Sequence, residues 1–199
     1  VPDWVDTSAP RLRLVTHKEI FEHAEDLPTF NSNAIELNLH RIAGLSECFF
    51  YLNDDFFVSQ PVTKDFYVDQ EHKRINLYID GYTAPETKEM QNNIWHESVG
   101  RTNRMISKYY YPGKIVKKHH YAGHHCYFFD KNILRLVGDR YTKQIDKTTA
   151  SKFRSENDVT VPILHASTAL EEFGANIYRK HFAFLAWSED HERNEASWN

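Results

Sequence analysis

The sequence predicts an α/β fold, with a mostly parallel, Rossmann-like sheet, flanking helices and a helical C-terminal third. Three observations support this prediction. Arg11–Val15 alternates like a short strand and leads into a helix-start signal, and strand followed by helix is typical of α/β units. Cys48–Leu52 is a continuous apolar run bounded by polar residues, as in a buried central strand. From Val159 to about Trp187 the chain is apolar with a helical pattern, interrupted near Gly174.

The first helices are predicted by their capping residues. Thr16–Glu19 has the spacing of a capping box, so we expect a helix from about residue 17 to residue 24. Asn33 and Glu36 repeat this spacing before an apolar helical face, and Gly44 is a natural end for the second helix.

Shorter patterns predict the middle of the chain. We expect strands at Phe66–Val68 and Ile75–Ile79, helices at Ser98–Tyr110 and Asp130–Tyr141, a loop at Thr83–Asn93 and a linker at Thr142–Lys152. No shift in composition marks a domain boundary, so we expect residues 1–199 to form a single domain.

The composition excludes several classes of protein. There are 24 Lys and Arg against 28 Asp and Glu, a net charge of −4, so a generic binder of nucleic-acid backbones is not expected. With 41% apolar residues the chain is globular rather than disordered. No apolar run approaches a membrane span, and the first residues lack the features of a signal peptide. Cys48 and Cys126 lie in aromatic surroundings and are expected to be buried free thiols.

Two adjacent carboxylates, Asp54 and Asp55, follow the predicted strand at Cys48–Leu52. Ligands of open α/β sheets bind beyond the carboxyl ends of the strands, and such oxygen ligands suit Mg²⁺ or Mn²⁺. The alternative is that Asn53–Asp55 forms a solvated turn, for which these residue types are equally suited.

Two more residues have both a chemical and a purely structural interpretation. Glu36 is either a capping-box glutamate or a carboxylate presented into a cleft beside Asp55. Arg154 precedes an apolar helix and either grips a phosphate in a forked geometry or is a solvated residue beside a helix cap. In the same segment Ser155 could cap that helix, with Asp158 at the capping-box position.

Four histidines lie close together in the sequence, at His119, His120, His124 and His125. One interpretation is a zinc site completed by Cys126. Adjacent histidines of one loop rarely all reach one ion, so we favour a single histidine that acts as an acid–base catalyst or phosphate ligand. Lys117 and Lys118 would add positive charge beside it.

The segment LPTFNSNAIELNLHRIAGLSECFFYLNDDFF, Leu27–Phe57, resembles the second conserved block of the Stealth family. Asn103–Ile133 is similar to the third block, in which a histidine lies six residues before the residue that opens a helix, as His124 precedes Asp130. Lys152–Val161 is similar to the short fourth block. The family's first block has no counterpart here, so we expect a catalytic domain that is a fragment lacking that block.

The resemblance implies a phosphotransferase of capsule polysaccharide synthesis. Stealth proteins include bacterial sugar-1-phosphate transferases and the catalytic subunit of the lysosomal-enzyme GlcNAc-1-phosphotransferase. Their reaction moves a hexosamine-1-phosphate from a UDP-sugar, such as UDP-GlcNAc or UDP-ManNAc, to a hydroxyl of an oligosaccharide or polysaccharide acceptor, and releases UMP. We therefore expect a bacterial, cytoplasmic enzyme that uses Mg²⁺ or Mn²⁺ and associates peripherally with the membrane.

The same resemblance implies the active-site residues Glu36, Asp55, His124 and Arg154. Asp55, with Asp54, would hold Mg²⁺ on the pyrophosphate, and Arg154 would neutralise phosphate charge in the transition state. Either His124 or Glu36 would be the general base. Secondary candidates for binding the donor are Asn103, Lys117 and Asp158.

Two other functions stay open on the sequence. A metal-dependent glycosyltransferase would share the donor but attack its anomeric carbon and release UDP. A non-catalytic carbohydrate-binding module would use surface aromatic residues, although most of the 13 Phe and 11 Tyr are expected in the core.

Overall fold

A computed structural model describes residues 2–56, 58, 61–85, 94–114, 116, 118–122 and 125–179. The helices are α1 (His17–Ile20), α2 (Ser32–Asn38), α3 (Lys64–Tyr67), α4 (Ile94–Tyr110), α5 (Lys131–Arg140), α6 (Thr142–Thr149) and α7 (Val161–Phe173), with short 3-10 turns at Ala24–Asp26 and Leu39–Arg41. The strands are β1 (Cys48–Tyr51), β2 (Val68–Asp69), β3 (Arg74–Pro85), β4 (Lys118–Ala122), β5 (Tyr127–Asp130) and β6 (Asn176–Arg179).

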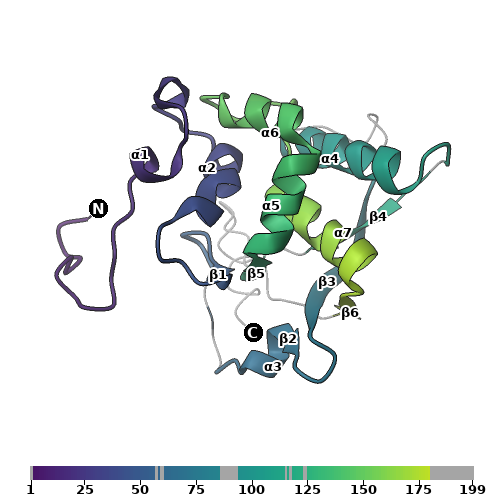
Figure 1. The fold of residues 1–199 in the computed structure, drawn as a ribbon, viewed down its shortest axis with the longest axis horizontal. Helices are drawn as coiled ribbons and strands as arrows, with labels where there is room; N and C mark the ends of the chain where they lie inside the picture. Colours follow the sequence, from purple (N-terminus) through teal and green to yellow (C-terminus); the bar gives the residue numbers. More distant parts are fainter. Residues whose placement is uncertain are drawn as a thin grey trace, which may run out of the picture.

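α5 stands near the centre of the molecule, and α6 and α7 pack against it (Figure 1). α6 lies across one end of α5 and also contacts α2, while α7 packs between α5 and α4. The strands β3 and β4 run beside α7. No helix within the described ranges is long and apolar enough to cross a membrane.

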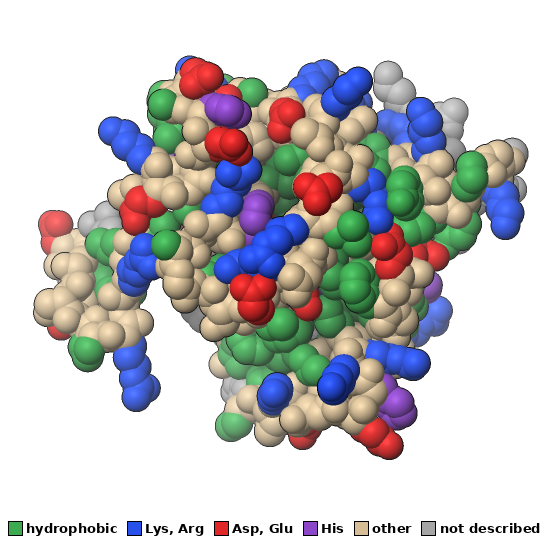
Figure 2. Space-filling view, viewed as in Figure 1, with side chains coloured by type: hydrophobic (Ala, Val, Ile, Leu, Met, Phe, Trp, Pro, Cys, Tyr) green, Lys and Arg blue, Asp and Glu red, His purple; other side chains and the backbone are tan. Residues whose placement is uncertain are grey.

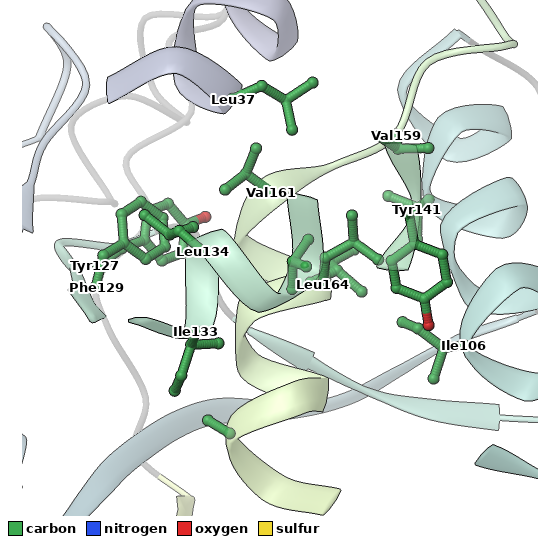
Figure 3. Packing of buried hydrophobic residues seen from close by; sticks show 14 of the residues in the cluster. Leu37, Ile106, Tyr127, Phe129, Ile133, Leu134, Tyr141, Val159, Val161 and Leu164 are labelled. Atoms are coloured by element: carbon green, nitrogen blue, oxygen red, sulfur yellow. The ribbon is translucent and has the colours of Figure 1, made fainter. Parts of the chain in front are cut away.

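The main core lies where α5, α7 and β5 meet. Phe129, Ile133 and Leu164 are fully buried there, and Leu37 of α2 and Ile106 of α4 close the cluster on opposite sides (Figure 3). A smaller cluster of Ile20, Phe21 and Ala34 joins α1 to α2. α2 therefore contributes to both clusters, which fixes its position in the fold.

The described strands form two small sheets. β1 pairs with β5 in antiparallel register, with Phe49 opposite Phe129 and Tyr51 opposite Tyr127. In the second sheet β3 pairs with β2 and β4 in antiparallel register and with β6 in parallel register. Hydrophobic side chains also reach the surface between α5, α7 and α3 (Figure 2).

A mixed α/β fold is therefore confirmed, but a mostly parallel, Rossmann-like sheet is not. Only the pair of β3 and β6 is parallel among the described strands. In β1 the side chains alternate between exposed and half-buried positions, whereas strands of a doubly covered parallel sheet are buried on both faces. The aromatic run at Cys48–Tyr51 thus belongs to a strand covered on one face, not to a central one. Cys48 is accordingly exposed rather than buried.

Several local expectations need correction as well. The segment expected as a linker after Tyr141 is the helix α6. Most of its residues are polar, but Ile145 packs against the main core and Thr148 is buried. The expected C-terminal helix ends at Phe173, where Gly174 adopts a left-handed φ of 61°, and β6 follows it. By contrast, α5 begins as predicted, because Oδ1 of Asp130 accepts a hydrogen bond from the N–H of Asn132 at 2.7 Å.

Candidate functional site

The site is built on α2 and on the end of β1. The cap of α2 is Asn31, whose Oδ1 accepts the N–H of Asn33 at 3.1 Å, so the helix starts two residues earlier than the capping pattern of Asn33 and Glu36 predicted. This shift rules out the capping-box interpretation of Glu36. Its side chain is instead buried, with 8% of the residue exposed.

Glu36 faces the phenol of Tyr51 on β1. Oε1 of Glu36 lies 3.0 Å from the Tyr51 hydroxyl, and Oδ1 of Asn53 lies 2.5 Å from the same hydroxyl on its other side. A phenol has one proton to donate to these two oxygens. When Tyr51 donates to Asn53, a protonated Glu36 can donate to Tyr51, so the three residues form a chain of two hydrogen bonds.

The burial of Glu36 favours its neutral form. Desolvation raises its pKa to about 7, against the opposing effects of the Tyr51 hydrogen bond and the positive charge of Arg154. Burial, with the nearby Glu36, raises the pKa of Tyr51 well above its ordinary value. At neutral pH, Glu36 therefore exchanges its proton readily while Tyr51 keeps its own.

Arg154 lies beside the N-terminus of α2. Its Nε and Nη2 donate to Oγ of Ser32 at 3.1 and 2.7 Å, and the side chain is exposed. Its charge lowers the pKa values of both Glu36 and Tyr51, which places the guanidinium within electrostatic range of both. Its other N–H groups have no protein acceptor in the described part of the chain, so they are available to an anionic ligand.

Asp158 fixes the segment that carries Arg154. Its carboxylate, 1% exposed, accepts hydrogen bonds from Nδ2 of Asn31 at 2.8 Å and from the N–H and Oγ of Ser155 at 2.9 and 3.1 Å. The expected pairing of Ser155 with Asp158 is present, but the cap of α7 is Thr160. Asp158 therefore joins the cap residue of α2 to the loop of Arg154.

Asp54 and Asp55 are both exposed at the turn that follows β1. Glu36, Tyr51, Asn53 and Arg154 together form the Glu36 cluster. The negative charge of Asp54 contributes to raising the pKa of Tyr51, so this carboxylate also lies near the cluster. Within the described ranges no group of three His, Cys, Asp or Glu side chains could hold a metal ion alone. Two exposed carboxylates fit Mg²⁺ nonetheless, because this ion keeps several waters and is commonly shared between one or two carboxylates and substrate phosphates.

Three of the four clustered histidines lie at a second feature, a cavity of about 510 Å³ between β3, β4 and α7. His119, His120, His125 and Lys114 line it together with the ring of Tyr127. That ring stacks on Tyr51 at 6.3 Å between ring centroids, so the cavity adjoins the Glu36 cluster through β5. Lys117 and His124 lie outside the described residues.

His125 is held by both of its ring nitrogens. Nδ1 lies 2.7 Å from the carbonyl oxygen of Cys126, and Nε2 lies 3.0 Å from that of Tyr78. Carbonyl oxygens only accept hydrogen bonds, so the ring satisfies both contacts only as the imidazolium cation. Of the two adjacent histidines, His125 thus links two backbone segments and is poorly placed to accept a proton from a substrate.

Asn103, a secondary candidate, is fully buried in α4, and its carbonyl accepts a hydrogen bond from Oγ of Ser107. Oγ of Ser107 in turn lies 2.8 Å from Nε2 of His119, one of the residues that line the cavity. Asn103 is therefore linked to the lining of the cavity through Ser107.

Comparison with protein families gives two matches. Residues 1–76 match the conserved region described as Stealth protein CR2, and residues 123–167 match Stealth protein CR3. Together these regions cover more than half of the chain and include every residue of the Glu36 cluster. The chain belongs to the Stealth family.

Curated Stealth relatives carry transferase names. An exopolysaccharide phosphotransferase of Streptomyces coelicolor is 36% identical over 162 residues, which cover 81% of this chain and 27% of the relative. The capsular polysaccharide phosphotransferase SacB of Neisseria meningitidis serogroup A is 32% identical over 80% of this chain and 28% of the relative. The capsular polysaccharide phosphotransferase fcs1 of Haemophilus influenzae is 27% identical over 89% of this chain and 48% of the relative. The chain thus spans about a quarter to a half of the lengths of these relatives.

The Stealth resemblance nominates Glu36 and Arg154, and the structure adds the residues that they contact, Tyr51 and Ser32. Tyr51 lies in the apolar run predicted as a strand, is the last residue of β1 and carries the hydroxyl that meets Glu36. Sequence patterns also gave no signal for Arg101 of α4. Its Nη1 lies 3.5 Å from Oδ1 of Asn157, and its buried Nε has no hydrogen-bond partner among the described residues.

Proposed function

We propose that this chain carries the catalytic centre of a phosphotransferase of capsule polysaccharide synthesis. Its donor would be a UDP-hexosamine, UDP-GlcNAc or UDP-ManNAc, and its acceptor a hydroxyl of an oligosaccharide or polysaccharide. Membership of the Stealth family and the names of its relatives support transfer of a sugar phosphate. The observation that carries the proposal is the buried carboxyl of Glu36, held by Tyr51 within electrostatic range of Arg154.

In the proposed reaction the acceptor hydroxyl oxygen attacks the phosphorus that bears the sugar. A new P–O bond forms, the bond from this phosphorus to the bridging oxygen of the pyrophosphate breaks, and UMP leaves with the bridging oxygen and that bonding pair. The hydroxyl proton passes to a general base. Phosphoryl transfer of this kind needs mainly positioning and charge stabilisation, which suits a site built from a base, a guanidinium and carboxylates.

Glu36 is suited to the role of the base. A catalytic base works best when its pKa lies near the working pH, and burial brings the pKa of Glu36 to about 7. Its contact with the Tyr51 hydroxyl holds the carboxyl in place, and the same hydroxyl can accept a hydrogen bond from the protonated form of Glu36. His124 is the other candidate base. It would serve instead as a hydrogen-bond donor to phosphate if Glu36 takes the proton.

Arg154 would bind the transferred phosphoryl group. Two of its nitrogens are fixed by Ser32, and its other N–H groups can meet phosphate oxygens in a forked geometry. Asp54 and Asp55 would hold Mg²⁺ or Mn²⁺, which when bound would neutralise charge on the pyrophosphate. In this scheme Lys117 would add positive charge at the donor, the buried Asn103 would support the lining of the cavity through Ser107, and Asp158 positions the loop of Arg154.

The test is product analysis with the full-length protein, UDP-GlcNAc or UDP-ManNAc, Mg²⁺ and a capsule oligosaccharide. We expect release of UMP and a new phosphodiester signal in the ³¹P NMR spectrum of the oligosaccharide. Release of UDP would instead identify a glycosyltransferase. Binding of sugar without any nucleotide release would identify a carbohydrate-binding module, and either result would overturn the proposal.

A further inference from the structure

Two exposed phenylalanine rings stack on each other at the edge of the candidate site. Phe30 is 69% exposed and Phe153 is 68% exposed, with ring centroids 5.5 Å apart and planes inclined by only 15°. Single exposed apolar residues are common on protein surfaces and need no explanation. A parallel pair that leaves most of its surface in water is a larger apolar feature, and it offers a flat apolar surface to a ligand.

The backbone on both sides of this pair is fixed. The N–H of Phe30 donates to the carbonyl of Lys152 at 2.8 Å, and Oγ of Ser151 donates to the carbonyl of Phe153 at 2.8 Å. Nδ2 of Asn31 lies 3.4 Å from that same carbonyl. The backbone that carries the two rings is thus ordered before any ligand arrives, which reduces the entropy lost on binding.

The pair adjoins the reacting groups. Phe153 directly precedes Arg154, and Phe30 lies two residues before Ser32, the serine to which Arg154 donates. A ligand lying on the rings therefore has the guanidinium within reach, and beyond it the buried carboxyl of Glu36. Lys152 and Arg154 flank the second ring along the chain, so the surface beside the rings carries positive charge.

We infer that Phe30 and Phe153 form a platform on which a sugar ring of the acceptor saccharide stacks, an inference that rests on the proposed function. The apolar face of a sugar ring suits an aromatic surface, and the neighbouring cations suit an acceptor that bears phosphodiesters. A nucleobase of the donor would fit less well. Sites for small molecules are usually concave and contain polar groups that meet the edges of the ligand. These two rings are open to solvent instead. An open surface leaves room for a long polymer chain to continue in both directions.

The test compares the full-length Phe30→Ala and Phe153→Ala variants with a matched control, Phe173→Ala, whose ring is half exposed at the end of α7. Each platform variant should raise the KM for the acceptor oligosaccharide about tenfold, and the KM for the UDP-sugar should not change. The double variant should lose little more than either single one, because the two rings act together. Phe153→Trp should restore most of the affinity, and Phe173→Ala should behave as wild type.

Other outcomes would overturn the inference. A rise in the KM for the UDP-sugar alone would make the pair a nucleobase platform. Loss of binding to anionic vesicles with an unchanged acceptor KM would make it a membrane contact. Direct binding of the oligosaccharide, measured by titration calorimetry, separates this inference from the proposed reaction. A wild-type protein that binds the saccharide through these rings but releases no UMP would contradict the proposed function and leave the platform standing.

Discussion

Nδ2 of Asn31 donates a hydrogen bond of 2.8 Å to Oδ2 of Asp158, across 127 residues of sequence. Asn31 caps α2, which carries Glu36, and Asp158 orders the loop that carries Arg154. Both groups are buried, so this contact is shielded from water. It sets the position of the carboxyl relative to the guanidinium, and the integrity of the site should depend on it.

Asp158→Ala should therefore destabilise the protein. The substitution leaves the buried amide of Asn31 and the N–H of Ser155 without their acceptor, which should lower the free energy of unfolding by about 2 kcal/mol. Urea denaturation measures this change in the free energy of unfolding. Glu156→Ala, in the same loop but exposed, is the matched control and should stay within about 0.5 kcal/mol of wild type. Equal stability of the two variants would show that Asp158 does not hold the loop.

Glu36→Gln should stabilise the protein at alkaline pH. The pKa of Glu36 is about 7 in the folded state and near its ordinary 4.5 in the unfolded chain, so the folded state binds the extra proton between these values. Stability contributed by that proton is complete below about pH 4.5 and is lost as the pH rises through 7. Glutamine has no proton to lose, and the gain at about pH 8 should reach about 3 kcal/mol.

Thermal unfolding as a function of pH measures this difference. The gain of Glu36→Gln over wild type should disappear near pH 4.5. Glu25→Gln, which replaces an exposed carboxylate by an amide, is the matched control. A Glu36→Gln protein that unfolds at lower temperature than wild type at alkaline pH would contradict the burial argument.

Tyr51→Phe should shift the pH dependence of catalysis. The hydroxyl of Tyr51 lowers the pKa of Glu36 by donating to it, so its removal should raise that pKa further above 7. If Glu36 is the base, the acid limb of the kcat/KM profile for UMP release moves to higher pH. Tyr67→Phe, on a ring outside the Glu36 cluster, is the control. An acid limb that stays in place would assign the base to another group, with His124 the first candidate.

Local signals predicted several elements of the fold. Apolar spacing predicted α4 and the central part of β3, and Asp130 marked the start of α5, because these features depend on residues within a few positions of each other. Strand pairing depends instead on residues that lie far apart in the sequence. Cys48 lies opposite Asp130, 82 residues away, and no pattern inside either strand specifies its partner. The helix α6 was likewise not predicted, because its inward face has only a few side chains and the rest of its sequence is rich in Lys and Thr.

The candidate site, like the fold, was predictable only in part. The resemblance was enough to nominate Glu36 and Arg154, but not to choose between a helix cap and a buried acid. That choice depends on which residue caps α2, and Asn31 rather than Asn33 does so because it also meets Asp158. The role of Tyr51 depends on the pairing of β1 with β5, which brings its hydroxyl to Glu36.

The most direct measurement is the initial rate of UMP release by the full-length wild-type and Glu36→Gln proteins in the presence of UDP-sugar, Mg²⁺ and acceptor. We expect one UMP per phosphodiester formed by the wild type. Glu36→Gln should be slower by about 10²- to 10⁴-fold, the usual contribution of a general base, without loss of thermal stability. A Glu36→Gln protein that releases UMP at the wild-type rate would contradict the assignment of this cluster as the catalytic centre.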